Sequence, residues 1–288
     1  MTEPSTIPPQ SARPCWAAGI TDESYHGDRE TVSSSTLKTL SSKSPAHARA
    51  DLDTPRPETP ALLLGRAVHC AVLEPDSYST RYAVAPVCDK RTKAGKEQWA
   101  QFVADHPGAS IITAADAETV DGIRAAIAAH PVARHAVRGG QAELSGYFTD
   151  PETGVHCRIR PDYLRSAEGV MVDLKTTLDA SPRGFERSIQ TFGYHLQAAF
   201  YSAGHEAITG EHLRDFLFLT VEKVRPYAVG VYRIEDQALD VGRQQYRAAL
   251  RQWAECLEHD HCPAYSDRIE SISLPTWALI QSDEVSPC

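Results

Sequence analysis

The 288-residue sequence has no long apolar run and no leader-like start, and these absences exclude several classes of protein. No stretch approaches the roughly 18 consecutive apolar residues that a membrane-spanning helix needs. The first residues, MTEPSTIPPQSARP, are polar and proline-rich and lack the apolar core of a signal peptide. We therefore expect a soluble, intracellular protein with no membrane partner, whose first residues form a flexible arm.

Cysteine pairs with the spacing of a metal cluster or a disulfide framework are also missing. The seven cysteines are odd in number and scattered, as is typical of reduced thiols. Cys256 and Cys262 have the spacing seen in some iron–sulfur nucleases, but no CxxC stands beside them, which favours a packed C-terminal segment over a cluster. The sequence also contains no P-loop, so we expect no nucleotide requirement.

Acidic residues outnumber basic residues, and the formal net charge is −9. This balance argues against a general coating of nucleic acid but says little about a local groove. Basic residues cluster in several places, and each cluster alone is typical of a solvated face. The clusters are Lys90, Arg91, Lys93 and Lys96; Arg134, His135 and Arg138; Arg158, Arg160 and Arg165; Arg183 and Arg187.

The hydrophobic pattern changes along the chain from helical to strand-like and back. Start signals at Ser44-Pro45 and Thr59-Pro60 and apolar residues at three- and four-residue spacing predict helices before Gly139-Gly140. The pattern predicts an α/β (α+β) protein with one domain. Its parts are a flexible arm at 1–23 and a domain at 24–288, divided into a mostly helical part at 24–140, a sheet core at 141–235, and a C-terminal helix and tail at 236–288.

The sheet core contains short runs of strand-forming residues separated by turn signals. AELSGYF, VHCRIRPDYL and VMVDLKTT are separated by TDPETG and SAEG, which predicts a three-strand meander. A helical pattern follows at 181–207. Two further strands are expected at DFLFLTVE and YAVGVYRI, and a long helix at 236–258.

The last two strands of this meander place like charges opposite each other. If Ser166–Gly169 form a four-residue loop, Asp162 lies directly across from Asp173. Opposed like charges destabilise a hairpin, so a positive group should lie between them. Lys175 falls on the same strand face as Asp173, while the alternating apolar residues point to the other face.

Two carboxylates and an ammonium are groups that could hydrolyse a phosphodiester with the help of a divalent cation. The cation would neutralise phosphate charge and lower the pKa of a bound water. Oxygen ligands suit Mg²⁺, and Mn²⁺ could substitute. Lys175 would orient the water or stabilise the developing negative charge. The alternative to a catalytic role is that Asp173 and Lys175 lie on an exposed strand edge and only pair their charges locally.

The spacing of these residues resembles that of a known nuclease superfamily. Pro161-Asp162, ten residues and then Asp-Leu-Lys match the PD-(D/E)xK pattern. In FGYHLQAAFY, Gln197 and Tyr201 resemble the QxxxY motif of the RecB-like branch, although Tyr201 could be ordinary helix packing and Gln197 a surface amide. Further similarity to the phage-type nuclease domain of the RecE (exonuclease VIII) family runs from about Ser24 to Trp277. It is carried by YHGDRETVSSSTLKTLSSKSPAHARA, ALLLGRAVHCAVLEP and YSDRIESISLPTWA.

The resemblance implies a fold and a role for each matching residue. The fold would be a restriction-endonuclease-like core with a central mixed sheet flanked by helices and a helical N-terminal part. His69, Asp162 and Asp173 would bind metal, and Lys175 would be the catalytic lysine. His69 could instead be a core histidine.

Three further residues would belong to the catalytic site. Glu143 matches an acidic position before the PD strand, although it could be an ordinary strand glutamate paired with an arginine. Gln197 and Tyr201 would hold the lysine side of the site or contact DNA.

The activity implied by the resemblance is a Mg²⁺-dependent exodeoxyribonuclease. It would degrade linear duplex DNA from 5′ ends and leave 3′ single strands for recombination, in the cytoplasm of a bacterial or phage-infected cell. A ring-like homo-oligomer and a RecT-like single-strand annealing partner are also implied. The alternatives are a nicking or flap-cutting endonuclease of the same superfamily and a non-catalytic DNA-binding module.

Overall fold

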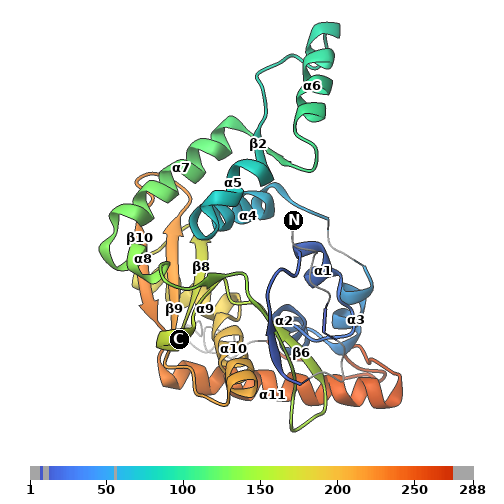
Figure 1. Cartoon of the computed structure of the whole chain (residues 1–288). Helices are drawn as coiled ribbons and strands as arrows, with labels where there is room; N and C mark the ends of the chain where they lie inside the picture. Colours follow the sequence, from blue (N-terminus) through green and yellow to red (C-terminus); the bar gives the residue numbers. More distant parts are fainter. Residues whose placement is uncertain (1–6, 9–12, 55–56, 275–288) are drawn as a thin grey trace, which may run out of the picture.

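The computed structural model describes residues 7–8, 13–54 and 57–274. Much of the expected arm and the end of the expected tail, including Trp277, therefore lie outside the described residues. Within the described residues, no helix combines the length and apolar character needed to cross a membrane. Figure 1 shows a sheet with helices on both sides and one helix, α6, that projects from the rest of the molecule.

A mixed five-stranded sheet forms the centre of the fold, as expected. Its strand order is β10-β9-β8-β7-β4, in which β8 and β9 are parallel and the other neighbours antiparallel. The connection from β8 to β9 passes through helices α9 and α10, the usual crossover between parallel strands. The strands are β4 (Gln141–Ala142), β7 (Tyr163–Arg165), β8 (Val170–Thr177), β9 (Asp215–Glu222) and β10 (Val229–Arg233).

Helices cover the two faces of this sheet and create two hydrophobic cores. One core contains α4, α7 and α8 against Val170, Val172 and Leu174, and the other contains α2, α10 and α11 against Met171 and Phe218. The helices against the sheet are α2 (Ser34–Ser42), α4 (Pro60–Leu73), α7 (Ala114–Ala129), α8 (Pro131–Ala136), α9 (Pro182–Thr191), α10 (Tyr194–Thr209) and α11 (Asp236–His259). Other elements are α1 (Asp22–Gly27), α3 (Pro45–Asp53), α5 (Pro75–Arg81), α6 (Lys93–Asp105), and the parallel pair β2 (Tyr82–Val84) and β3 (Ser110–Ile112).

The expected helix starts at Ser44-Pro45 and Thr59-Pro60 are confirmed. The hydroxyl of Ser44 accepts from His47 N, and that of Thr59 accepts from Leu62 N. These bonds satisfy backbone N–H groups that have no partner within a helix.

The expected three-strand meander is wrong, because two of its strands each divide between two sheets. AELSGYF divides into β4 and β5 (Ser145–Thr149), and VHCRIRPDYL into β6 (His156–Ile159) and β7. β5 and β6 belong to a small second sheet with order β1-β5-β6. The breaks fall at Glu143, whose φ is 51°, and beside Pro161, which has no N–H to donate to a ladder.

The flexible arm expected for residues 1–23 is wrong for residues 15–17. They form β1 (Cys15–Ala17), which pairs with β5. The following segment is held by a buried guanidinium, since Arg160 donates to Asp22 Oδ1, Ile20 O and Ser145 Oγ at 2.9 Å each. The N-terminal segment is thus part of the folded domain from Cys15 onward.

Two of the clustered arginines are structural rather than solvated. Arg158 and Arg160 are both buried, and Arg158 lies 3.4 Å from Asp28 and donates to Thr31 Oγ1 at 2.8 Å. Both guanidiniums also lie over the ring of Tyr25. These two arginines therefore join the N-terminal segment to β6 and do not form an open basic surface.

A substitution at Gly242 should test the close packing of α10 and α11. A Cβ at this glycine of α11 would lie 2.2 Å from the carbonyl oxygen of His195 in α10. We expect Gly242→Ala to lower the free energy of unfolding by about 1–3 kcal/mol, because the helices must separate. Denaturant titration followed by circular dichroism would measure this loss.

Gly65→Ala in α4 is the matched control. A Cβ there meets nothing within 4 Å, so the change should raise stability by about 0.5–1 kcal/mol through helix propensity. Equal effects of the two substitutions would contradict the assigned packing.

Candidate active site

The β7–β8 hairpin has the register expected from the sequence. Arg165 pairs with Val170 and Tyr163 with Val172, around a 3-10 turn that ends at Gly169. The φ of Gly169 is 62°, a left-handed conformation that glycine adopts without strain. Asp162 directly precedes β7, so the same register carries it opposite Asp173.

The two faces of β8 also divide as expected. Val170, Val172 and Leu174 belong to one hydrophobic core, whereas Asp173 and Lys175 point to the other side. Lys175 Nζ lies 2.5 Å from Asp173 Oδ2. The strand therefore packs with one face and presents paired charges on the other.

Asp162 is a desolvated carboxylate beside an imidazole. Its Oδ2 accepts from the backbone N–H of Leu174 at 2.7 Å and lies 3.6 Å from Nδ1 of His69 in α4. Burial raises the pKa of Asp162, proximity of His69 lowers it, and the charge of Asp173 raises it. The net result is a raised pKa.

Glu143 lies beside Asp162 because both sheet breaks meet there. Its backbone N–H donates to the carbonyl of Asp162 at 3.1 Å. Burial, followed by the charge of Asp162, raises the pKa of Glu143 to about 9. The ionised forms of Glu143 and Asp162 are therefore both unfavourable unless a positive charge lies between the two carboxyl groups.

His69, Glu143 and Asp162 form a donor set that fits a divalent cation. One ligand atom from each residue lies within 4.8 Å of the others. The two carboxylates suit Mg²⁺ and Mn²⁺, and the imidazole nitrogen is a ligand more typical of transition metals. The three side chains come from α4, the β4–β5 break and the start of β7, so only the folded chain unites them.

His69 lines an open cavity and is not enclosed in the core. Its side chain is 26% exposed. The cavity of 360 Å³ is also lined by Glu143, Asp22, His26 and Arg66. Solvent and ions therefore have access to this end of the donor set.

Asp173 stands apart from this donor set, although it is a metal ligand in the sequence prediction. Gln197 Nε2 donates to its Oδ1 at 2.7 Å. Its Oδ2 is buried and forms an ion pair with Lys175. This oxygen could accept a cation, so a metal role for Asp173 remains a prediction.

Lys175 remains charged in spite of its burial. Desolvation lowers its pKa, but the carboxylates of Asp173 and Asp162 reverse this effect and leave the pKa raised. Its ammonium lies 4.7 Å from the centre of the Tyr194 ring. The site thus keeps a fixed positive charge next to its two aspartates.

Gln197 connects the site to helix α2. It is 7% exposed, so the alternative of a surface amide is wrong. Besides its bond to Asp173, its Oε1 accepts from Lys38 Nζ at 2.8 Å. Gln197 therefore holds a carboxylate with one end and a lysine with the other.

Tyr201 lies one helical turn further along α10, within the hydrophobic core. Burial raises the pKa of Tyr201, and a hydrogen bond with Ser34 lowers it. Ser34 and Lys38 of α2 thus face Tyr201 and Gln197 of α10, each pair four residues apart. The QxxxY motif joins two helices here, with only its glutamine in contact with the carboxylates.

Sequence reasoning missed Lys38, the second lysine of the site. Burial, followed by repulsion from Lys175, lowers the pKa of Lys38 to about 7. Its position four residues after Ser34 was the available signal, but nothing in the sequence showed that α2 would pack against α10.

Comparison with known proteins agrees with this geometry. Residues 33–275 match the model of a family described as "PDDEXK-like domain of unknown function (DUF3799)". The chain belongs to this family. With the fold and the hairpin, this membership supports a PD-(D/E)xK nuclease, while likeness to RecE in particular stays a prediction.

Searches for individual relatives add a fold match. A search of the curated proteins found no match. Among solved structures, a "putative exonuclease" from Eubacterium rectale matches with a TM-score of 0.59 and 17% identity, over 91% of this chain and 98% of that chain. At this identity the likeness shows a shared fold.

Divalent cations should stabilise the folded protein through His69, Glu143 and Asp162. A free cation concentration of a hundred times the dissociation constant should raise the free energy of unfolding by about 2.7 kcal/mol, which would be seen as a higher melting temperature. The stabilisation should grow as the pH rises, because protons compete for carboxyl groups whose pKa is raised.

Asp162→Asn should abolish most of this stabilisation, measured with Mn²⁺ and Mg²⁺ by differential scanning calorimetry. Asp76→Asn, an exposed aspartate in α5, is the control and should respond like the wild type. An undiminished shift in Asp162→Asn would show that the donor set does not bind the cation.

Proposed function

We propose that the protein is a divalent-metal-dependent exodeoxyribonuclease that hydrolyses linear duplex DNA. The single observation that carries the proposal is the β7–β8 hairpin, which brings Asp162 and Asp173 together beside Lys175. Paired carboxylates with an adjacent ammonium suit phosphodiester hydrolysis. Membership of a PDDEXK-like family supports the nuclease part of the proposal.

In this function, His69, Glu143 and Asp162 would hold the cation, and the buried Oδ2 of Asp173 would join them beside Lys175. The cation supplies charge neutralisation for the phosphate and a lower pKa for bound water. Lys175 places a fixed ammonium where negative charge grows on the phosphate in the transition state. Lys175 thereby acts as the electrostatic catalyst supplied by the chain itself.

Gln197 acts as a positioning residue in this scheme. Its hydrogen bond to Asp173 Oδ1 fixes the carboxylate while Oδ2 faces Lys175. Removing the amide would leave a buried carboxylate oxygen without its donor, which is costly. The bond therefore preserves the spacing between the carboxylate and the ammonium.

The choice of cation, the polarity, the exonuclease action and the partners are supported by different observations. Resemblance to the RecE family supports Mg²⁺ as the cation, 5′ to 3′ polarity, a role in recombination, a ring-like oligomer and a RecT-like partner. The description of the Eubacterium rectale protein supports exonuclease rather than endonuclease action. Local basic groups such as Lys38 and Lys175 make DNA binding compatible with an acidic total charge.

Digestion of end-labelled DNA should test the activity. Linear duplex labelled at its 5′ or 3′ end would be incubated with Mg²⁺ or with chelator, beside a closed circle. We expect early release of the 5′ label from linear DNA, no release with chelator, and an intact circle. Cutting of the circle would replace the exonuclease with an endonuclease, and no metal-dependent digestion would favour a binding module.

Substitutions within the hairpin should abolish this digestion. Asp173→Asn and Lys175→Ala should each lower the rate by at least about 10²-fold, since the first weakens a proposed metal ligand and the second removes the ammonium that stabilises negative charge on the phosphate. Asp121→Asn, an exposed aspartate of α7, is the control and should keep the wild-type rate. Near-normal rates in both hairpin variants, at matched folded protein, would refute the site.

A further inference from the structure

Lys38 is a largely buried amine that has no carboxylate partner among the described residues. Its Nζ donates to the neutral oxygen of Gln197 at 2.8 Å and lies 5.1 Å from the Tyr194 ring centre. Lys175 faces the same ring and already has Asp173 as its ion-pair partner. Among the described residues, Lys38 has no such carboxylate partner. Burial disfavours the charged form of an unpaired amine, and a bound anion would stabilise that form.

Repulsion between the two lysines supports the same conclusion. Burial and the charge of Lys175 lower the pKa of Lys38 to about 7. An anion near both ammonium groups would reverse this shift by stabilising the charged form. A DNA phosphate is the anion that the proposed substrate supplies.

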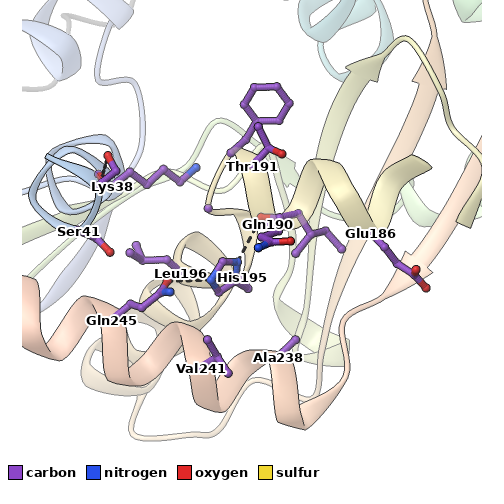
Figure 2. Close-up of a pocket in the computed structure, with 14 residues that line it drawn as sticks. Lys38, Ser41, Glu186, Gln190, Thr191, His195, Leu196, Ala238, Val241 and Gln245 are labelled. Carbon is purple, nitrogen blue, oxygen red and sulfur yellow. Dashed lines mark hydrogen bonds between the residues drawn. The ribbon is translucent and has the colours of Figure 1, made fainter. Parts of the chain in front are cut away.

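A groove opens beside Lys38, and its lining includes neither His69 nor Glu143. It has a volume of 640 Å³, within the range of about 300–1,000 Å³ typical of ligand sites. Figure 2 shows Lys38 reaching from α2 across the groove toward the turn between α9 and α10. Residues of α2, α9, α10 and α11 form the walls.

Hydrogen bonds hold the walls of this groove in place. The ring of His195 is bonded through Nδ1 to the carbonyl of Ile189 at 3.2 Å and through Nε2 to Gln245 Oε1 at 2.7 Å (Figure 2). These bonds connect α9, α10 and α11. The groove is thus built by the fold before any ligand arrives.

An exposed aromatic ring stands at the edge of the groove. Phe192 directly follows α9, is 56% exposed, and has its ring centre 5.6 Å from that of Tyr194. The next residue, Gly193, has φ 61°, and a Cβ there would lie 3.3 Å from Lys38 Cγ. The turn therefore holds the exposed ring next to Lys38. Exposed aromatic rings of this kind stack on nucleobases.

We infer that this groove is a nucleotide-binding subsite for a DNA strand next to the catalytic hairpin. Lys38 contacts a backbone phosphate, and Phe192 stacks on a base. The inference rests on the proposed function, since it takes DNA as the substrate. Helix α2 and the α9–α10 turn then guide the DNA strand toward Asp173 and Lys175.

Equilibrium binding without cleavage tests the phosphate contact. Wild-type protein in chelator would be titrated with labelled linear duplex over a series of salt concentrations. Lys38→Gln keeps a hydrogen-bond donor but loses the charge, and should weaken binding about tenfold. The slope of log K against log salt should become less steep by about 1. Lys38→Arg should restore the slope.

Lys43→Gln is the matched control. Lys43 follows α2, is exposed, and is absent from the groove wall. It should bind duplex with the wild-type affinity and salt slope. Melting temperatures of all variants would show whether each one is folded at the assay temperature.

Base stacking has its own readout. Duplex carrying 2-aminopurine in an unpaired 5′ overhang should lose fluorescence on binding the wild type, because the unpaired base stacks on Phe192. Phe192→Leu should lose this quenching and bind several-fold more weakly, whereas Phe192→Tyr should keep both properties.

Two further results would overturn the inference in different ways. Duplex binding by the wild type with unchanged affinity, salt slope and quenching in Lys38→Gln and Phe192→Leu would refute the subsite alone. Lys38 would then act only by holding Gln197. No duplex binding by the wild type would refute the subsite and the DNA-directed function together.

Discussion

Repulsion among buried carboxylates is the constraint on which the site depends. Asp162 and Asp173 meet across a hairpin, and Glu143 lies beside Asp162. Such an arrangement opposes folding unless positive charge is supplied. Lys175 supplies part of it from the same strand, and a divalent cation on the donor set would supply the rest. The unfavourable spacing of acids is therefore the feature that makes the site selective for cations.

The fold supports this constraint by bringing several elements to one point. Breaks in two strands place Glu143 and Asp162 together where the chain passes between sheets. Helix α4 adds His69 from one side, and α10 adds Gln197 from the other. The apolar face of β8 is buried against helices, which anchors the hairpin. Rigid packing on one face thus keeps charged groups positioned on the opposite face.

Helix α2 extends the site beyond the motif residues. Its Lys38 and Ser34 face Gln197 and Tyr201 across the α2–α10 contact. The QxxxY motif consequently serves packing and chemistry together: its tyrosine belongs to the core and its glutamine to the site. In the proposed function, a second lysine near Lys175 would help this end of the site to bind a polyanionic substrate.

Local sequence determined the hairpin register, the two faces of β8 and the main helix starts, because turn length, side-chain alternation and capping act over a few residues. Only the tertiary structure decided that Glu143 joins His69 and Asp162, that Lys38 reaches Gln197, and that Arg158 and Arg160 are buried. The division of two expected strands between sheets likewise needed the whole fold. These features depend on contacts between residues far apart in the chain, which no local pattern specifies.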